Sequence, residues 1–418
     1  MTGSLAQRLA LRGALPRNLR HEPGPLRIGF LAPLSGPFAP GGAPGLEGCR
    51  IWADWVNDDG GMSVGTFRRP VEIIARDAAI SAGQTVEYAR EQLAAGVHIV
   101  LALGGESLAP ALPLLMQQRV LTTTLLPFDL NPAAPSLIAP VDLHPLFVVV
   151  AVEWLARNWQ GLRRVALCSQ QDLMGLPALA TYRAAFLAAG FQIVDEAHHD
   201  GDRYDAPALV SRMLAAGAEA LCWCGSEPHM IHALTLAAFD AGFTGPMLAC
   251  TGDGYERMVA QTSVKFMENF VFHFPDFDDP ALADTAFFYR SPASFFLAYR
   301  QRSPAHWSAV SWEYAAALDL WHAAVEIAGS ADPVRVLPAM KRGEHMMHVF
   351  GPARWYGERL FGIDNALIGC WPVVAVRDGV AQIVDFGSVL DWLVQHEDLL
   401  MRELAREGLA LPQLSPLA

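Results

Sequence analysis

The sequence predicts an α/β protein built from two doubly wound parallel β-sheets. Short apolar runs typical of buried strands alternate with segments that carry apolar residues at helical spacing. This alternation occurs twice, once on each side of the segment APVDLHP at residues 139–145. The chain has 418 residues, of which 52% are hydrophobic, so it is long and apolar enough for two domains with separate cores.

The first set of elements lies before residue 139. Its expected strands are 26–33, 71–77, 97–103 and 120–125, and its expected helices between them are 46–58, 83–95 and 108–118. The segment that opens the set, RIGFLAPLSGPFAPGGAPGLEG at 27–48, is an apolar run that breaks into Pro and Gly before a helical pattern begins. Such a turn leaves backbone N–H groups free for a polar or anionic ligand group.

The second set runs from residue 146 to residue 274. Its expected helices are 146–158, 176–189, 206–216, 228–241 and 254–262, and its expected strands are 164–169, 191–198, 219–224, 246–251 and 269–274. The stretch 202–223 shows one unit clearly, because Asp205 is a plausible N-cap and Gly217 ends the helix before the next strand.

After Pro275 the order of elements changes. Long helices are expected at about 280–302 and 308–329, followed by short strands near 349–356, 364–376 and 380–385. Late elements of this kind return to complete earlier domains, so the chain is expected to cross between domains more than once.

The charge balance and the hydropathy exclude two kinds of partner. The chain carries 30 Lys and Arg against 43 Asp and Glu, a net charge of −13, and lacks a basic block, so no nucleic-acid partner is predicted. Its longest apolar stretches, such as LFVVVAVEWLA from Leu146, are too short for a membrane span. Residues 1–25 are expected to form a basic N-terminal extension rather than a secretory leader.

The six cysteines do not form a disulfide framework pattern, and free buried thiols are predicted. Cys222, Cys224, His229 and His232 have the spacing C-x-C-x4-H-x2-H, which raises the question of a zinc site. The pattern lacks the separation of structural zinc sites, so neither a metal nor a cofactor is predicted.

Three common enzyme motifs are absent from the sequence. The glycines after the first strand do not have the spacing of a dinucleotide-binding G-x-G-x-x-G, and no phosphate-binding G-x-x-x-x-G-K-[ST] occurs. In GGESLAP, Ala109 stands where a nucleophile elbow needs its final glycine. The chain is therefore not predicted to be an enzyme.

The segments RIGFLAPLSGPFAPGGAPGLEGCRIWADWVNDDGGM, PVEIIARDAAISAGQTVEYAREQLAAGVHIVLALGG, CTGDGYERM and SWEYAAALDLWHAAVEIAGS carry a resemblance that covers most of residues 26–385. The chain resembles the leucine/isoleucine/valine-binding protein family of ABC transporter substrate-binding proteins, which are type I periplasmic binding proteins. The resemblance implies two lobes joined by a three-segment hinge, with crossovers near 142–146, 273–278 and 346–352.

The domain boundaries that this resemblance implies divide the chain into four parts. Residues 1–25 form the N-terminal extension, residues 26–143 and 277–347 form lobe I, residues 144–276 and 348–392 form lobe II, and residues 393–418 form a C-terminal helix or tail. The two lobes are expected to close on a small ligand.

The resemblance also implies a set of ligand-binding residues. In lobe I, Ser107 and the N–H groups that follow Gly105 correspond to the usual carboxylate contacts, whereas Leu126 and Phe128 replace expected hydroxyls with an apolar wall. In lobe II, Met174 replaces the usual tyrosine, and Asp253 corresponds to the acid that meets an α-amino group. The complete predicted set is Ser35, Phe38, Gly105, Glu106, Ser107, Leu126, Phe128, Met174, Gly225 and Asp253.

These substitutions favour a compact ligand with an apolar or aromatic body, such as an aromatic or alkyl acid, an amide or an amine, over a plain branched-chain amino acid. The alternative for Phe38, Phe128 and Met174 is that they fill the core. The alternative for Glu106 is a solvated charge at a helix N-terminus.

Solute capture for an ABC importer, with permease subunits as partners and a periplasmic location, is the function that the resemblance implies. The alternative is a cytoplasmic ligand sensor, similar to the amide-responsive regulator of the same family, which passes closure to a regulatory protein. The absence of a leader favours the sensor, and the usual role of the family favours the importer.

Overall fold

The computed structural model describes residues 20–21, 24–36, 38–78, 82–172, 174–200, 203–283, 290–303, 307–342 and 347–409. The chain forms two compact units, which are described one at a time. Unit 1 comprises Met1–Leu143 and Phe277–Gly369, and unit 2 comprises His144–Asp276 and Cys370–Ala418. The predicted α/β class with parallel sheets is confirmed.

Unit 1 is built on a five-stranded sheet in which every neighbouring pair is parallel. The strands, in spatial order, are β5 (Val71–Asp77), β2 (Leu26–Ala32), β6 (Ile99–Ala102), β7 (Leu121–Thr123) and β8 (Leu137–Ile138). The central strands lack polar alternation because helices cover both faces of a parallel sheet. A small second sheet joins β1 (Arg20–His21), β4 (Phe67–Arg69) and β3 (Met62–Val64).

Seven helices belong to unit 1 among the described residues. They are α2 (Ala43–Asp58), α3 (Ala82–Ala94), α4 (Leu112–Gln117), α11 (Pro292–Arg302), α12 (Val310–Ala328), α13 (Pro333–Arg342) and α14 (Glu358–Phe361). Helices α2 and α12 touch through glycine. A Cβ on Gly45 would lie 2.1 Å from the Tyr314 ring, and one on Gly48 would lie 2.0 Å from the Ser311 carbonyl oxygen. Only glycine permits this approach, which anchors the late helix α12 against α2.

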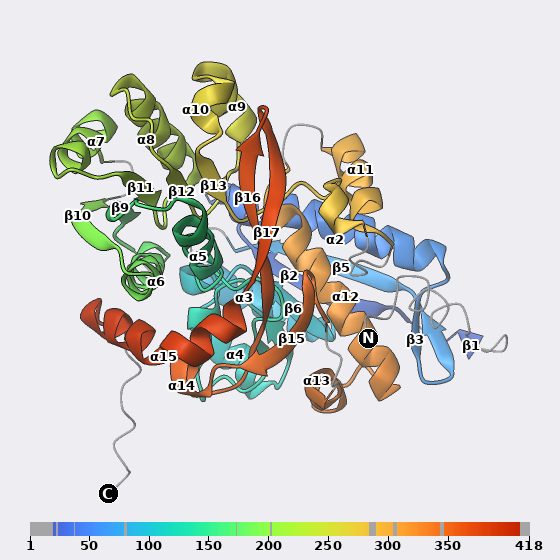
Figure 1. The fold of residues 1–418 in the computed structure, drawn as a ribbon. Coiled ribbons are helices and arrows are strands. Elements are labelled where there is room, and N and C mark those ends of the chain that lie inside the picture. The colour runs from blue at the N-terminus through green and yellow to red at the C-terminus, as the bar shows by residue number, and fades with distance from the viewer. Residues whose placement is uncertain are drawn as a thin grey trace, which may run out of the picture. The chain divides into compact units, whose positions relative to one another are not determined.

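Unit 2 carries a second parallel sheet with two added antiparallel strands. Its strands, in order, are β10 (Gln192–His199), β9 (Arg164–Gln170), β11 (Ala220–Trp223), β12 (Met247–Ala249), β13 (Phe270–Phe272) and β16 (Ala366–Arg377), and β17 (Val380–Ser388) pairs with β16. Figure 1 shows β16 and β17 as a long hairpin.

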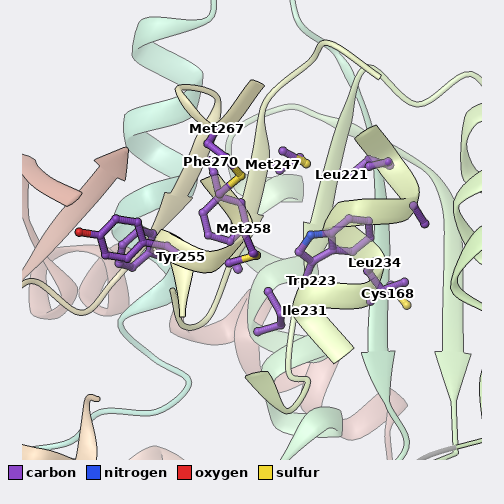
Figure 2. Packing of buried hydrophobic residues seen from close by; sticks show 14 of the residues in the cluster. Cys168, Leu221, Trp223, Ile231, Leu234, Met247, Tyr255, Met258, Met267 and Phe270 are labelled. Carbon is purple, nitrogen blue, oxygen red and sulfur yellow. The ribbon is translucent and has the colours of Figure 1, made fainter. Parts of the chain in front are cut away.

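The described helices of unit 2 are α5 (Val148–Asn158), α6 (Gly175–Ala188), α7 (Ala206–Ala215), α8 (Pro228–Asp240), α9 (Tyr255–Gln261), α10 (Val264–Met267) and α15 (Val389–Arg406). Helices α6 to α10 follow parallel strands, whereas α5 precedes β9 and α15 follows β17. The core between β11, β12 and α8 is rich in Met and aromatic side chains (Figure 2). Trp223 is fully buried in it, and its Nε1 donates to Thr235 Oγ1 at 3.2 Å. The polar indole atom is thereby satisfied inside the apolar cluster.

The expectation of one helix over 280–302 is wrong. A short 3₁₀ turn η4 (Pro280–Leu282) is followed by a turn at Ala283, and α11 begins only at Pro292; residues 284–289 lie outside the described residues. The reason is local, because Ser291 Oγ accepts the Ser294 N–H at 3.2 Å and Pro292 occupies the first helical turn.

The third change of unit falls at Gly369–Cys370, within β16, whereas the resemblance placed the third crossover near 346–352. Strand β15 (Gly351–Tyr356), which pairs with β14 (Met347–His348), also pairs with the first residues of β16 from Ala366 to Gly369. Asn365 ties the same segment to unit 1, since its Nδ2 donates to the Leu137 carbonyl oxygen at 2.6 Å.

Candidate functional site

The seven predicted residues of unit 1 all lie in loops at the carboxyl edge of its parallel sheet. Ligands of open α/β sheets bind at this edge, because loops leave the parallel strands there and expose N–H groups. Ser35 and Phe38 follow β2, the 3₁₀ turn η2 (Gly105–Ser107) follows β6, and Leu126 and Phe128 follow β7. The structure therefore brings these residues to one end of one sheet.

The loop after β2 presents an aromatic ring to solvent. Phe38 is 57% exposed and Ser35 is exposed as well, so Phe38 does not fill the core. The loop is fixed to the neighbouring strand, since the Leu34 N–H donates to Asp77 Oδ1 at 2.8 Å. This arrangement leaves an apolar surface at the edge without loosening the loop that carries it.

The turn after β6 is organised around a carboxylate that sequence reasoning did not single out. The Gly105 N–H donates to both oxygens of Asp129, at 3.1 Å to Oδ1 and 2.9 Å to Oδ2. Thr124 Oγ1 donates to Asp129 Oδ2 at 2.7 Å. A Cβ on Gly104 would lie 2.3 Å from both Asp129 Oδ2 and Thr124 Oγ1, so the glycine leaves room for this carboxylate.

Burial raises the pKa of Asp129 above its ordinary value, although the hydrogen bonds from Thr124 and from the Gly105 N–H act in the opposite direction. Asp129 directly follows Phe128 in the sequence, and the local pattern does not distinguish it from a solvated loop carboxylate.

The remaining side chains of this edge differ in their surroundings. Ser107 Oγ donates to the Gly104 carbonyl oxygen at 2.7 Å, so its hydroxyl supports the turn itself. Glu106 is exposed, and Leu126 is half-buried. Phe128 is half-buried and packs edge-on against Phe361, with ring centroids 5.3 Å apart.

The three predicted residues of unit 2 also lie in loops at the carboxyl edge of their own sheet. Met174 precedes α6 after β9, Gly225 follows β11, and Asp253 follows β12. Met174 and Asp253 are half-buried. The Met174 N–H donates to Asp172 Oδ1 at 2.9 Å, and the Asp253 N–H donates to Thr251 Oγ1 at 3.2 Å.

Gly225 has a packing role in the structure. A Cβ there would lie 2.8 Å from both Gly175 Cα and Ala178 Cβ, so glycine lets the loop after β11 touch the start of α6. The Gly225 carbonyl oxygen also accepts the Gln170 N–H at 3.0 Å. These contacts fix the two loops of this edge to each other.

The cysteines are free thiols, as predicted, with five of them buried and Cys370 half-buried. Cys222 Sγ and Cys224 Sγ lie 3.7 Å apart. Within the described ranges, no group of three or more His, Cys, Asp or Glu side chains is arranged to hold a metal ion. A cavity of about 540 Å³ in unit 1, lined among others by Phe67, His98 and Gly329, includes none of the predicted site residues.

The helices of the described chain include none with the length and apolar character needed to cross a membrane.

Comparison with known proteins agrees with this architecture. A family model described as periplasmic binding protein matches residues 25–381. No curated protein matches the chain by sequence. An ABC transporter substrate-binding protein from Sphaerobacter thermophilus shares the fold at a TM-score of 0.72 and 20% identity, covering 87% of this chain and 98% of its own.

Two further solved structures share the fold. A leucine-binding protein from Thermotoga maritima has a TM-score of 0.68 at 16% identity, covering 88% of this chain and 99% of its own. A solute-binding protein of an ABC transporter from Rhodopseudomonas palustris, in complex with 3,4-dihydroxybenzoic acid, has a TM-score of 0.69 at 17% identity, covering 87% of this chain and 97% of its own.

Both α/β units carry loops at the carboxyl edge of a parallel sheet, the edge at which open α/β sheets bind ligands. The chain belongs to the periplasmic binding protein family, since the family model matches far more than half of its length. The resemblance inferred from the sequence is thereby confirmed.

Proposed function

We propose that the chain is the substrate-binding component of an ABC importer, and that its partners are the permease subunits of that importer. The observation that carries this proposal is the family match over residues 25–381. Support comes from the similar proteins, which are ABC transporter substrate-binding proteins. A receptor of this kind needs no catalytic residue, only contacts that bury most of a small molecule.

The two compact units are proposed to be the two lobes, each contributing the carboxyl edge of its sheet to the solute. In unit 1 the exposed ring of Phe38 and the half-buried ring of Phe128 would pack against an apolar body. In unit 2 the carboxylate of Asp253 would accept from a donor group on the solute. The matched family model is described as periplasmic binding protein, so a periplasmic location is part of this proposal.

A second candidate is a cytoplasmic ligand sensor of the same fold, which would signal to a regulatory protein. One observation favours it. The six cysteines are free, and Cys222 and Cys224 remain unjoined thiols although their sulfur atoms are 3.7 Å apart. Free thiols are typical of a reducing compartment.

Cell fractionation separates these two candidates. Cells expressing the chain from its native locus are fractionated, and the chain is detected in each fraction. The importer proposal predicts the chain outside the cytoplasm. Recovery of the chain wholly in the cytoplasm contradicts the importer and leaves the sensor.

The solute itself is found by thermal-shift screening of the purified chain against amino acids, aromatic acids, short amides, amines and dicarboxylates. A ligand that binds only the folded state raises the melting temperature, and the stabilisation grows with the logarithm of its concentration above Kd. At about 100 times Kd the stabilisation is about 2.7 kcal/mol. Absence of any shift across these classes contradicts solute capture, and steady consumption of a bound compound contradicts a purely binding role.

A further inference from the structure

The turn after β6 in unit 1 has the form of an anion-binding site. Gly104 and Gly105 have φ values of +108° and +56°, in the left-handed region that favours glycine, at the end of the strand. Backbone N–H groups presented by such glycine turns bind anions such as carboxylates and phosphates. The Gly105 N–H and the Thr124 hydroxyl are the donors of this turn, and Thr124 is fully buried.

These donors already hold a carboxylate from the chain itself. The Gly105 N–H and Thr124 Oγ1 both donate to Asp129, at 2.9 Å and 2.7 Å to Oδ2. Asp129 follows β7, the strand next to β6, so its carboxylate reaches the turn from the neighbouring loop. The donors that suit an anionic solute are therefore satisfied internally.

The negative charge of the surrounding loops also disfavours binding of an anionic solute. The described parts of the five loops at this edge are residues 33–36 with 38–42, 77–78, 103–108, 124–130 and 139–143. Their sequences contain four acidic residues and no Lys, Arg or His; the acidic residues are Asp77, Glu106, Asp129 and Asp142. A carboxylate brought to these loops would meet like charge without a compensating cation, which weakens binding.

We propose that Asp129 determines the ligand class of this protein, by filling the anion-accepting turn of unit 1 and presenting its own carboxylate to a solute that carries an ammonium or amide N–H. A carboxylate offers about four acceptor positions, and the contacts with Gly105 and Thr124 leave acceptor capacity for such a donor. The inference rests on the proposed function, because it concerns the solute that the receptor captures. With Asp129 in this role, the protein is expected to prefer amines and amides to the aromatic and alkyl acids that the sequence also allowed.

The test uses compounds that share one body and differ only in the polar group. Benzylamine, benzamide and benzoate form one set, and 3-methylbutylamine, 3-methylbutanamide and 3-methylbutanoate form a second. Isothermal titration calorimetry with the full chain at neutral pH gives the affinity of each compound. The wild type is expected to bind the amine or amide about tenfold or more tightly than the acid with the same body.

Two variants of Asp129 separate its charge from its bulk. D129A opens the turn and frees the Gly105 N–H, so the acid members are expected to gain about tenfold in affinity while the amines lose a similar factor. D129N keeps an oxygen acceptor for Gly105 but removes the charge, so the amines weaken and the acids gain less than in D129A. Because D129N preserves the turn, it gives a result even if D129A folds poorly.

The control is E87Q, which removes the same charge from an exposed position on α3 of unit 1. Its affinities are expected to match those of the wild type. Tightest binding of an acid by the wild type, or unchanged acid-to-amine ratios in both Asp129 variants, overturns the role of Asp129 and leaves solute capture intact. Failure of all six compounds and of every class in the thermal-shift screen overturns the proposed function as well.

Discussion

The carboxyl edges of the two sheets are built by different means. In unit 1 the loops after β6 and β7 are joined by hydrogen bonds to the Asp129 carboxylate, and the Phe38 ring lies exposed beside them. In unit 2 the loops after β9 and β11 are joined by close backbone packing of Gly225 against Gly175. We therefore expect substitutions of Asp129 and Phe38 in unit 1 to change ligand preference, whereas substitution of Gly225 in unit 2 should mainly change stability.

The largest effect is expected for Arg183 on α6, the helix that begins at the edge of unit 2. Its side chain is 1% exposed and contacts Glu196, Glu403 and Glu407 at 2.8, 3.4 and 2.8 Å. Among the described residues, R183M leaves only the exposed Arg406 near these carboxylates, 3.6 Å from Glu196 and 3.7 Å from Glu403, so the free energy of unfolding should fall by about 3 kcal/mol. Urea denaturation followed by circular dichroism measures this loss.

The matched control is R212M on α7 of the same unit. Arg212 pairs with Asp195, but its side chain is 51% exposed. Exposed ion pairs contribute about 0–1 kcal/mol, so this variant should unfold close to the wild type. Equal losses of unfolding free energy in R183M and R212M would show that the ion pairs of Arg183, including the one from α6 to Glu403 on α15, do not stabilise unit 2.

Acid should destabilise unit 2 through His273, which is buried, and His144, which is half-buried. Burial lowers the pKa of His144 to about 4 and that of His273 to about 3. Each histidine therefore favours folding fully above its unfolded pKa of about 6.5, and this contribution is lost as the pH falls toward the folded pKa. Between pH 7 and pH 5 the free energy of unfolding should fall by about 2 kcal/mol per histidine.

Urea midpoints at pH 7, 6 and 5 for the wild type and H273Q measure this dependence. In H273Q the free energy of unfolding should fall only about half as much between pH 7 and pH 5 as in the wild type, whatever the stability of the variant at pH 7. An unchanged slope in H273Q would show that His273 is not held neutral in the folded state. Near-ultraviolet circular dichroism adds a local readout, because Trp371 Nε1 donates to the His273 carbonyl oxygen at 2.9 Å.

A smaller loss of stability is expected for G225A. The added methyl would lie 2.8 Å from Gly175 Cα and Ala178 Cβ, so the loop or the start of α6 must shift. Overpacking of this kind costs about 1–3 kcal/mol. An unchanged unfolding midpoint would mean that the two loops separate without cost, and the edge of unit 2 would not be sterically fixed.

The smallest effect on stability is expected at the edge of unit 1. F38S removes a ring that is 57% exposed, so the free energy of unfolding should change by no more than about 0.5 kcal/mol. Affinity for benzylamine should nevertheless fall about tenfold, because the ring would lose its apolar contact with the ligand. L297S, at a 61% exposed position on α11 of unit 1, is the control and should bind as the wild type. Equal affinities for F38S and L297S would place the Phe38 ring outside the site.

Periodicity was sufficient to predict most of the elements of both sheets. The run LRIGFLAP and the segment from Asp205 to Trp223 contain complete local signals, namely an apolar strand, a cap and a glycine stop. The helix break before Pro292 was missed because it depends on one cap at Ser291, which an apolar pattern does not reveal. The position of the third change of unit was also missed, since it depends on long-range pairing of β15 with the first residues of β16.

The sequence was sufficient to place the predicted site residues in loops, but not to find the contacts of Asp129. The loops after β2, β6, β7, β9, β11 and β12 could be named from strand ends alone. The contact of Asp129 with Gly105 joins residues 24 positions apart, and no spacing rule connects them. Gly225 was predicted to bind ligand, but the contact that its missing Cβ permits with Gly175 becomes apparent only in three dimensions.

Calorimetric titration of the wild-type chain with the compound that gives the largest thermal shift tests the central claim most directly. The proposed solute-binding function predicts saturable binding of one solute molecule per chain, and the solute should be recovered chemically unchanged. Absence of saturable binding, or recovery of a converted compound, would contradict a protein that captures a small solute and releases it intact.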